Sequence, residues 1–249
     1  MQDSLSTGSR AGHTAIVRER IARGGERLWR AEDFQGLPVS AVAQALSRLV
    51  RARYLERLSK GVYYRARPTA FGPSKPNPAA VETLAKRRGG VFPAGIAAAG
   101  MLGLTTQTAR RKEVATSALS LPRKLVGSDT VIHTRRPEAW SSLTPTEAAI
   151  LDVLRRGARS SELTPQETAK RLQRLLQEDN RLKRLLRVAL SEPPRVRAML
   201  GALAEDIRPK RSELVRLRAS LNPFSRFDFG LLGVLPHAKK WQAKGSTRP

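Results

Sequence analysis

Residues 39–51, VSAVAQALSRLVR, decide the fold that the sequence predicts for the first part of this chain. Four apolar residues recur within them three, one and three apart, as a single buried stripe on a helix requires. They are Val42, Ala45, Leu46 and Leu49. The turn Gly36-Leu37-Pro38 precedes the stretch, and its proline suits the first turn of a helix. The sequence therefore predicts a helix that runs to about Arg53.

The other face of this helix carries polar and basic side chains three and four residues apart. Such residues project together, away from the predicted core. They are Ser40, Gln44, Ser47, Arg48 and Arg51. Serine and glutamine interleaved with arginine on one stripe favour a binding surface. The alternative for Arg48 and Arg51 is a solvated helix face, which is what most surface arginines form.

A basic β-hairpin is predicted directly after this helix. Two short β-prone runs, at 54–58 and 61–65, surround the turn Ser59-Lys60-Gly61. The hairpin carries Arg57, Lys60 and Arg65. Upstream, a short helix is predicted over 14–23, stopped by two glycines and followed by a short segment at 28–34.

Three short helices followed at once by a basic hairpin are the order of a winged helix-turn-helix. In that arrangement the last helix enters the major groove, where Gln and Arg reach base edges, and the hairpin supplies cations to backbone phosphates. We therefore expect a winged helix-turn-helix DNA-binding domain in residues 1–75, with double-stranded DNA as its partner. The predicted DNA-binding residues are Ser40, Gln44, Ser47, Arg48, Arg51, Arg57, Lys60 and Arg65.

The charge of the chain agrees with an anionic partner. Lys and Arg number 46 against 21 Asp and Glu, so the formal net charge is +25. Nucleic acid and membrane surfaces are the commonest partners of so basic a chain. Residues 1–75 carry a net +8 and residues 141–249 a net +11. We therefore expect a second basic surface, in the C-terminal domain, that also touches DNA phosphates.

The sequence offers little for catalysis. It has no cysteine, and its three histidines lie about a hundred residues apart, so thiol chemistry and a local metal-ligand cluster are excluded. Walker-type loops, Gly-x-Ser-x-Gly elbows and paired carboxylates are absent. His133 is more often a satisfied core or edge histidine than a base, and Gly127-Ser128-Asp129 is interpreted as a turn. We expect a protein that is not an enzyme, with no catalytic residues, cofactor or metal.

The second part of the chain is predicted to be a larger, helix-rich domain at 76–249, joined by a linker at 67–78 that is rich in Pro, Gly and Ser. Thr-Pro-x-Glu helix starts recur at 144–147 and 164–167. The other expected elements are helices at 79–88 and 95–102, strands at 114–117 and 130–134 with a basic loop at 122–124 between them, a long leucine-rich helical stretch over 172–190, and a closing segment at 224–233 that packs into this domain. The expected fold class is α+β and mostly helical, with a few short strands.

Residues 89–109 contain no charge, a length that could span a bilayer. Their Ala, Gly and Thr content favours a buried small-residue helix, so no membrane partner is expected. The N-terminus lacks the apolar run of a secretory signal. We expect a cytoplasmic protein.

Several motifs together resemble the AbiEi-type antitoxins of type IV toxin-antitoxin systems, and the resemblance covers most of the chain. They are Asp33-Phe34, Gln44-Ala-Leu-Ser-Arg-Leu49, Gly61-Val-Tyr-Tyr-Arg65, Pro68-Thr-Ala-Phe-Gly72, Gly103-Leu-Thr-Thr-Gln107, Ala115-Thr-Ser117, Arg123-Lys124 and Phe227-Asp-Phe-Gly-Leu-Leu232. The resemblance implies a transcriptional repressor that binds inverted repeats in its own promoter, a C-terminal domain that counters a nucleotidyltransferase-like toxin with or without direct contact, and a role in phage defence. The sequence departs from the family at Pro38 and Val39, which shifts the expected base contacts toward Gln44, Ser47, Arg48 and Arg51.

Other functions stay open at this stage. A general winged-helix transcription regulator or an RNA-binding protein would also be basic, although only 12 aromatic residues are present to stack bases. A membrane-surface protein would need exposed Trp or Phe opposite a basic helix face, whereas residues 165–190 offer mostly leucine. Two copies on the operator are expected. A monomer in solution is compatible with the sequence, which shows no heptad seam.

Overall fold

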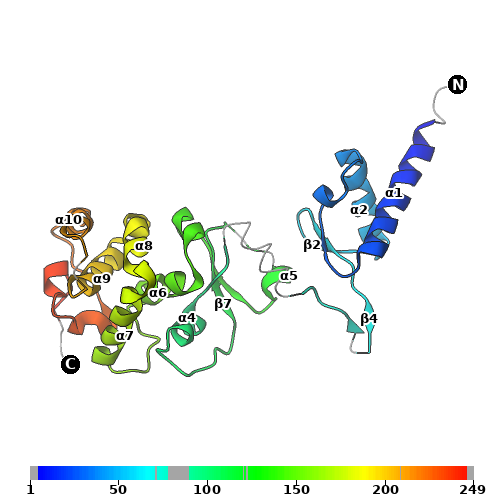
Figure 1. Ribbon diagram of the computed structural model, residues 1–249. Coiled ribbons are helices and arrows are strands. Elements are labelled where there is room, and N and C mark those ends of the chain that lie inside the picture. The colour runs from blue at the N-terminus through cyan, green and yellow to red at the C-terminus, as the bar shows by residue number, and fades with distance from the viewer. Residues whose placement is uncertain are drawn as a thin grey trace. The chain divides into compact units, whose positions relative to one another are not determined.

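A computed structural model describes residues 5–70, 72–77, 90–119, 121, 123–207 and 209–245. The chain forms two compact units, coloured along the chain in Figure 1. Unit 1 comprises Met1–Arg87 and Leu121–Ser128, and unit 2 comprises Arg88–Ser120 and Asp129–Pro249. The structure is α+β and mostly helical, as the sequence predicts. The division at residues 75 and 76 stays a prediction.

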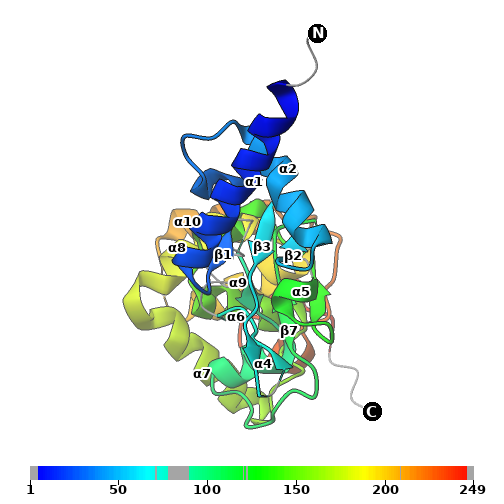
Figure 2. The same cartoon turned by 90° about the vertical axis from the view of Figure 1, so that its right-hand side faces the viewer.

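Unit 1 combines two long helices with a small antiparallel sheet. Its elements are α1 (Leu5–Gly24), β1 (Leu28–Trp29), the 3-10 turn η1 (Ala31–Asp33), α2 (Val39–Arg51), β2 (Glu56–Ser59), β3 (Val62–Tyr64), β4 (Pro68–Thr69), β5 (Gly72–Pro73) and α5 (Arg123–Val126). The three-stranded sheet has the order β1-β3-β2, and Figure 2 shows β3 between the other two strands. Both pairings are antiparallel, with Arg57 opposite Tyr63 in the hairpin.

The apolar stripe of α2 is buried, as its spacing predicts. Val42, Ala45, Leu46 and Leu49 pack in one cluster with Val17 and Ile21 of α1 and with Trp29, Phe34, Leu55 and Tyr63. The Trp29 and Phe34 rings stack at 5.5 Å between centroids. This packing fixes which face of α2 is turned to solvent.

Three elements of unit 1 differ from the sequence prediction. The helix expected at 14–23 begins at Leu5, and between it and α2 lie the strand β1 and the 3-10 turn η1. The expected linker contains the β4–β5 ladder, and the Tyr64 hydroxyl lies 2.9 Å from Ser74 Oγ. The expected basic loop at 122–124 contains the start of α5, a helical turn that packs against β2.

Unit 2 is a helical layer over a small mixed sheet. Its elements are β6 (Phe92–Pro93), α4 (Gly95–Met101), β7 (Glu113–Ala115), β8 (Val131–His133), η2 (Glu138–Ser142), α6 (Pro145–Arg155), α7 (Pro165–Gln177), η3 (Glu178–Asn180), α8 (Arg181–Val188), η4 (Ala189–Ser191), α9 (Pro194–Glu205), α10 (Arg211–Ala219), η5 (Gly230–Val234) and η6 (Lys239–Trp241). The sheet order is β6-β7-β8, antiparallel between β6 and β7 and parallel between β7 and β8. The strands expected near 114–117 and 130–134 and the helix near 95–102 are confirmed.

The twin helix starts are confirmed as capping boxes. The Thr144 and Thr164 hydroxyls each accept a hydrogen bond from the backbone N–H three residues later. The Glu147 and Glu167 carboxylates in turn accept one from the backbone N–H of the threonine. The long stretch expected over 172–190 is broken, because Asp179 and Asn180 have positive φ and separate α7 from α8. The helix expected at 79–88 lies outside the described residues.

The core of unit 2 forms mainly around α6 and α9, which bury most of their residues, together with Trp140 and Trp241. The closing segment packs into this core through Phe229 and Leu232, as predicted. Ala98 and Ala99 of α4 are fully buried, which agrees with a buried small-residue helix. No helix within the described ranges has the length and apolarity to cross a bilayer.

Candidate nucleic-acid interface

The polar face of α2 is exposed as one continuous stripe. The five side chains that the sequence groups together lie opposite the buried cluster. The α2 helix packs against α1 through that cluster. The exposed residues are Ser40, Gln44, Ser47, Arg48 and Arg51. A helix of this length is about 20 Å long, enough to lie along a major groove. The structure thus brings these five predicted residues to one surface.

The cations of α2 are not neutralised by neighbouring carboxylates. Every acidic side chain that the structure describes in unit 1 pairs with a Lys or Arg outside α2. The pairs are Glu19 with Arg23, Glu26 with Arg67, Glu32 with Arg30, Asp33 with Arg27 and Glu56 with Lys124. No ion pair among the described residues involves Arg48 or Arg51. Their positive potential is therefore directed at solvent, where a polyanion can reach it.

The hairpin adds two exposed cations. Arg57 on β2 and Lys60 in the turn are both exposed, and Arg57 Nε lies 3.4 Å from the Ser59 carbonyl oxygen. Gly61 has φ 74°, a conformation that glycine adopts without a steric cost, so the turn between the strands is tight. Positions at a hairpin tip suit contacts to backbone phosphates rather than to bases.

Arg65 has a different environment from the other predicted residues. It is half-buried, and its guanidinium lies 4.9 Å from the centre of the Tyr54 ring. The Arg18 guanidinium from α1 lies at the same distance from that ring. Arg65 also donates to the Ala22 carbonyl oxygen at 3.5 Å. Its contacts therefore attach the end of β3 to α1, and only part of its side chain is left for a ligand.

Sequence reasoning missed the contribution of α5. Arg123 and Lys124 are exposed on this turn, and Lys124 Nζ lies 2.9 Å from Glu56 Oε1. This ion pair cancels the one negative charge next to Arg57. A shallow pocket of about 400 Å³ is lined by Arg53, Arg57 and Lys124, among others. The basic pair was visible in the sequence, but no local pattern indicates that it joins a unit whose first segment ends at Arg87, 36 positions before Arg123.

Comparison with known proteins gives little. No family model matches the chain, and no curated protein matches it. Among solved structures, the chain is similar to the crystal structure of the RV2827C protein from Mycobacterium tuberculosis, with 17% sequence identity and a TM-score of 0.41. The match covers 86% of this chain and 83% of that one. At this score the likeness carries no argument about fold or function.

Proposed function

We propose that the chain is a sequence-specific double-stranded DNA-binding protein that represses transcription of its own operon in the cytoplasm. The observation that carries the proposal is the polar stripe of α2. Gln44, Ser47 and Arg48 are exposed side by side, and among the described residues no carboxylate pairs with Arg48 or Arg51. Gln and Arg are the side chains that pair in a bidentate manner with adenine and guanine in the major groove.

A winged helix-turn-helix is the fold we propose for unit 1. Helix, strand, helical turn, helix and hairpin follow one another in the order of that fold, and the β1-β3-β2 sheet supports it. In this arrangement α2 is the recognition helix. The departure is the middle helix, which is reduced to the 3-10 turn η1.

In the complex, Gln44, Ser47, Arg48 and Arg51 contact base edges or the groove walls, and Ser40 lies at the end of the helix near a phosphate. Arg57 and Lys60 contact backbone phosphates, and α5 adds Arg123 to that set. Phosphate contacts hold the protein in register but do not read sequence. The sequence specificity therefore depends on α2.

The test is competition binding with the full chain. A labelled duplex from upstream of its own gene is titrated with protein, and unlabelled random duplex, single-stranded RNA and anionic vesicles compete for it. We expect the upstream duplex to bind at least a thousandfold more tightly than random duplex, as specific complexes typically do. Equal affinity for random duplex, or preference for RNA or vesicles, would reject the proposal.

We further propose that the protein is an AbiEi-type antitoxin whose C-terminal domain counters a nucleotidyltransferase-like toxin and contributes to phage defence. This proposal is supported by the motifs that resemble the family. Co-expression tests it: if a neighbouring gene encodes such a toxin, the chain should restore growth to cells that express the toxin. A general transcription regulator would repress the operon without restoring growth.

A further inference from the structure

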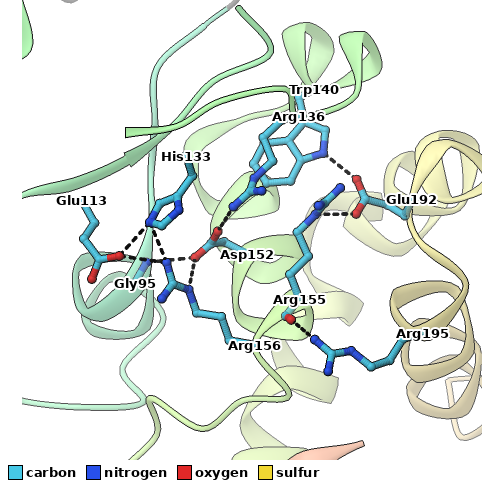
Figure 3. A network of polar contacts seen from close by, with 10 residues as sticks. All are labelled: Gly95, Glu113, His133, Arg136, Trp140, Asp152, Arg155, Arg156, Glu192 and Arg195. Atoms are coloured by element: carbon cyan, nitrogen blue, oxygen red, sulfur yellow. Dashed lines mark hydrogen bonds and ion pairs between the residues drawn. The ribbon is translucent and has the colours of Figure 1, made fainter. Parts of the chain in front are cut away.

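Unit 2 contains a pocket of about 360 Å³ whose lining is dominated by arginine. We call it the arginine pocket and define it by His133, Arg136, Arg155, Arg156, Pro193 and Arg195. Figure 3 draws the histidine and the four arginines, which come from β8, the loop after it, the end of α6 and the start of α9. Among the described residues, no carboxylate is part of the lining. Four guanidinium groups around one hollow are unusual, because like charges repel.

Buried carboxylates hold three of these guanidinium groups in fixed positions. Arg136 Nη2 lies 2.9 Å from Asp152 Oδ1, and Arg156 Nε lies 3.1 Å from Asp152 Oδ2. Arg155 Nε lies 2.8 Å from an oxygen of Glu192. The side chains of Asp152 and Glu192 are fully buried, and they also accept from the Gly95 N–H and from Trp140 Nε1. The two buried carboxylates therefore hold these arginine side chains in position, and each of their oxygens already accepts a hydrogen bond.

The pocket keeps unused hydrogen-bond donors and an excess of positive charge. Arg136 Nε is buried and lacks a partner within the described residues. In the same ranges the two terminal nitrogens of Arg155 have no hydrogen-bond acceptor. Glu113 is the third carboxylate of the network, at 2.8 Å from both Arg156 Nη2 and His133 Nε2. Four arginines thus face three carboxylates, which leaves one positive charge.

Two further features favour an anion in the pocket. The Arg136 and Arg155 guanidinium groups repel each other, and burial together with the Arg155 charge lowers the pKa of Arg136. Pro193 and Arg195 lie at the start of α9, and this helix start has no side-chain cap and no acidic residue in its first turn. Helix N-termini carry a partial positive charge. An anion in the pocket would reduce the repulsion between Arg136 and Arg155, and it would interact favourably with the positive end of α9.

We propose that the arginine pocket binds the phosphate group of a small phosphorylated ligand. Guanidinium forks match the oxygens of a phosphate in bidentate fashion, and several of them suit a multiply charged anion. The volume falls at the lower end of the range for small-molecule pockets. Arg136 and Arg155 are only 14% and 17% exposed, so a recessed group reaches them more readily than a strand of nucleic acid does.

Calorimetric titration of the full chain with inorganic pyrophosphate, at constant ionic strength adjusted with chloride, tests the proposal. We expect saturable binding of one pyrophosphate per chain. Arg195→Gln should weaken it tenfold or more. Within the described residues, the hydrogen bond that joins Arg195 to the pocket goes to the Arg155 carbonyl oxygen, so the substitution spares the buried ion pairs. Arg195→Lys is the second variant, for use if Arg195→Gln lowers the melting temperature: it keeps the positive charge but lacks the guanidinium fork, and it should weaken pyrophosphate binding less than Arg195→Gln does.

The matched control is Arg187→Gln, which removes the same charge from an exposed position on α8. It should leave pyrophosphate affinity unchanged. Absence of saturable binding, or an equal loss in the control, would overturn the proposal. Displacement of pyrophosphate by saturating random duplex would also overturn it, in favour of a contact to nucleic-acid backbone. Operator binding by Arg195→Gln is measured in parallel, so that failure of the DNA proposal is distinguished from failure of this one.

Discussion

Glu162 is an exposed carboxylate whose oxygens accept hydrogen bonds from three consecutive residues of one loop. Thr105 Oγ1 donates to it at 2.5 Å, the Thr106 N–H at 2.9 Å and Gln107 Nε2 at 2.8 Å. These hydrogen bonds, led by that of Thr105, lower the pKa of Glu162 from 4.5 to about 2. These three residues, 105–107, belong to the Gly103–Gln107 motif. Their structural role is to donate hydrogen bonds to Glu162.

The lowered pKa predicts how this carboxylate responds to pH. A carboxyl whose pKa is depressed by folding stabilises the native state above its unfolded value, near 4.5, and this contribution is lost as the pH falls toward about 2. The stabilities of the natural chain and of Glu162→Gln should therefore differ most at neutral pH, approach each other below about pH 4.5 and converge only near pH 2. A difference that is constant with pH would contradict this explanation. Carboxyl NMR titration gives the pKa directly.

Base contacts and phosphate contacts predict different effects of single substitutions on α2 and the hairpin. Arg48→Ala should lower affinity for the operator by about 1 to 3 kcal/mol and leave random duplex nearly unaffected. Lys60→Ala should weaken binding to both duplexes by the same factor, because phosphates are common to all sequences. Fluorescence anisotropy with the two duplexes measures both changes. An equal loss on random duplex for Arg48→Ala would place the reading surface on another face.

The α9 helix packs so closely against the Trp241 ring that position 201 has no room for a Cβ. A Cβ on Gly201 would lie 2.3 Å from the Trp241 ring, which is fully buried and whose Nε1 donates to Glu205 at 3.1 Å. Burial and the hydrogen bond to Glu205 therefore restrict movement of the Trp241 ring away from α9. Close packing here joins the C-terminal segment to the centre of unit 2.

Gly201→Ala should destabilise the protein by about 1 to 3 kcal/mol, although alanine is the better helix former. The matched control is Gly100→Ala in α4, where the nearest atom to a new Cβ, the Thr105 carbonyl oxygen, is 3.8 Å away. That change should stabilise by about 0.5 to 1 kcal/mol. Chemical denaturation of both variants measures the difference. The packing argument fails if the two substitutions have the same sign.

Elements specified by neighbouring residues could be predicted from the sequence. The buried stripe of α2, the hairpin turn at Gly61 and the capping boxes at Thr144 and Thr164 depend on residues within a few positions of one another. The break between α7 and α8 could not be predicted, because Asp179 and Asn180 in the left-handed region interrupt an apolar pattern that continues on both sides. The α5 turn is only four residues long and too short for a periodic signal.

The whole molecule is strongly cationic, and the DNA proposal predicts how binding depends on salt. With six to ten phosphates neutralised, log K should fall against log salt with a slope of about −5 to −9. Unit 2 contributes if its exposed cations on α7 and α8 contact DNA. These are Lys170, Arg174, Lys183 and Arg187.

Changing all four to glutamine should reduce the steepness of this slope by about 0.9 for each phosphate that is no longer neutralised. The measurement is operator affinity at several salt concentrations, compared with the natural chain. The same variant should keep its preference for operator over random duplex, because α2 is unchanged. An identical slope would mean that the excess charge of unit 2 has another purpose.

The two surfaces of the molecule differ in how far the sequence alone reveals them. The polar stripe of α2 lies within one helix, so its periodicity was sufficient to predict which side chains share a face. The arginine pocket combines positions 133, 136, 155, 156 and 195, which come from a strand, a loop and two helices. Nothing short of the tertiary structure places them together, and the charge count could only predict that some such concentration exists.

The chain enters unit 1 twice, and this bears on the order in which a newly made protein becomes functional. Its first pass ends at Arg87, and the piece that buries Leu121 and Val126 and pairs Lys124 with Glu56 is translated only after 33 residues of unit 2. Domains generally fold as units while the chain leaves the ribosome. A nascent chain therefore completes unit 1 only after residue 128 has been made and has left the ribosome. The unit to which we assign DNA binding is therefore incomplete while only its first segment has been made.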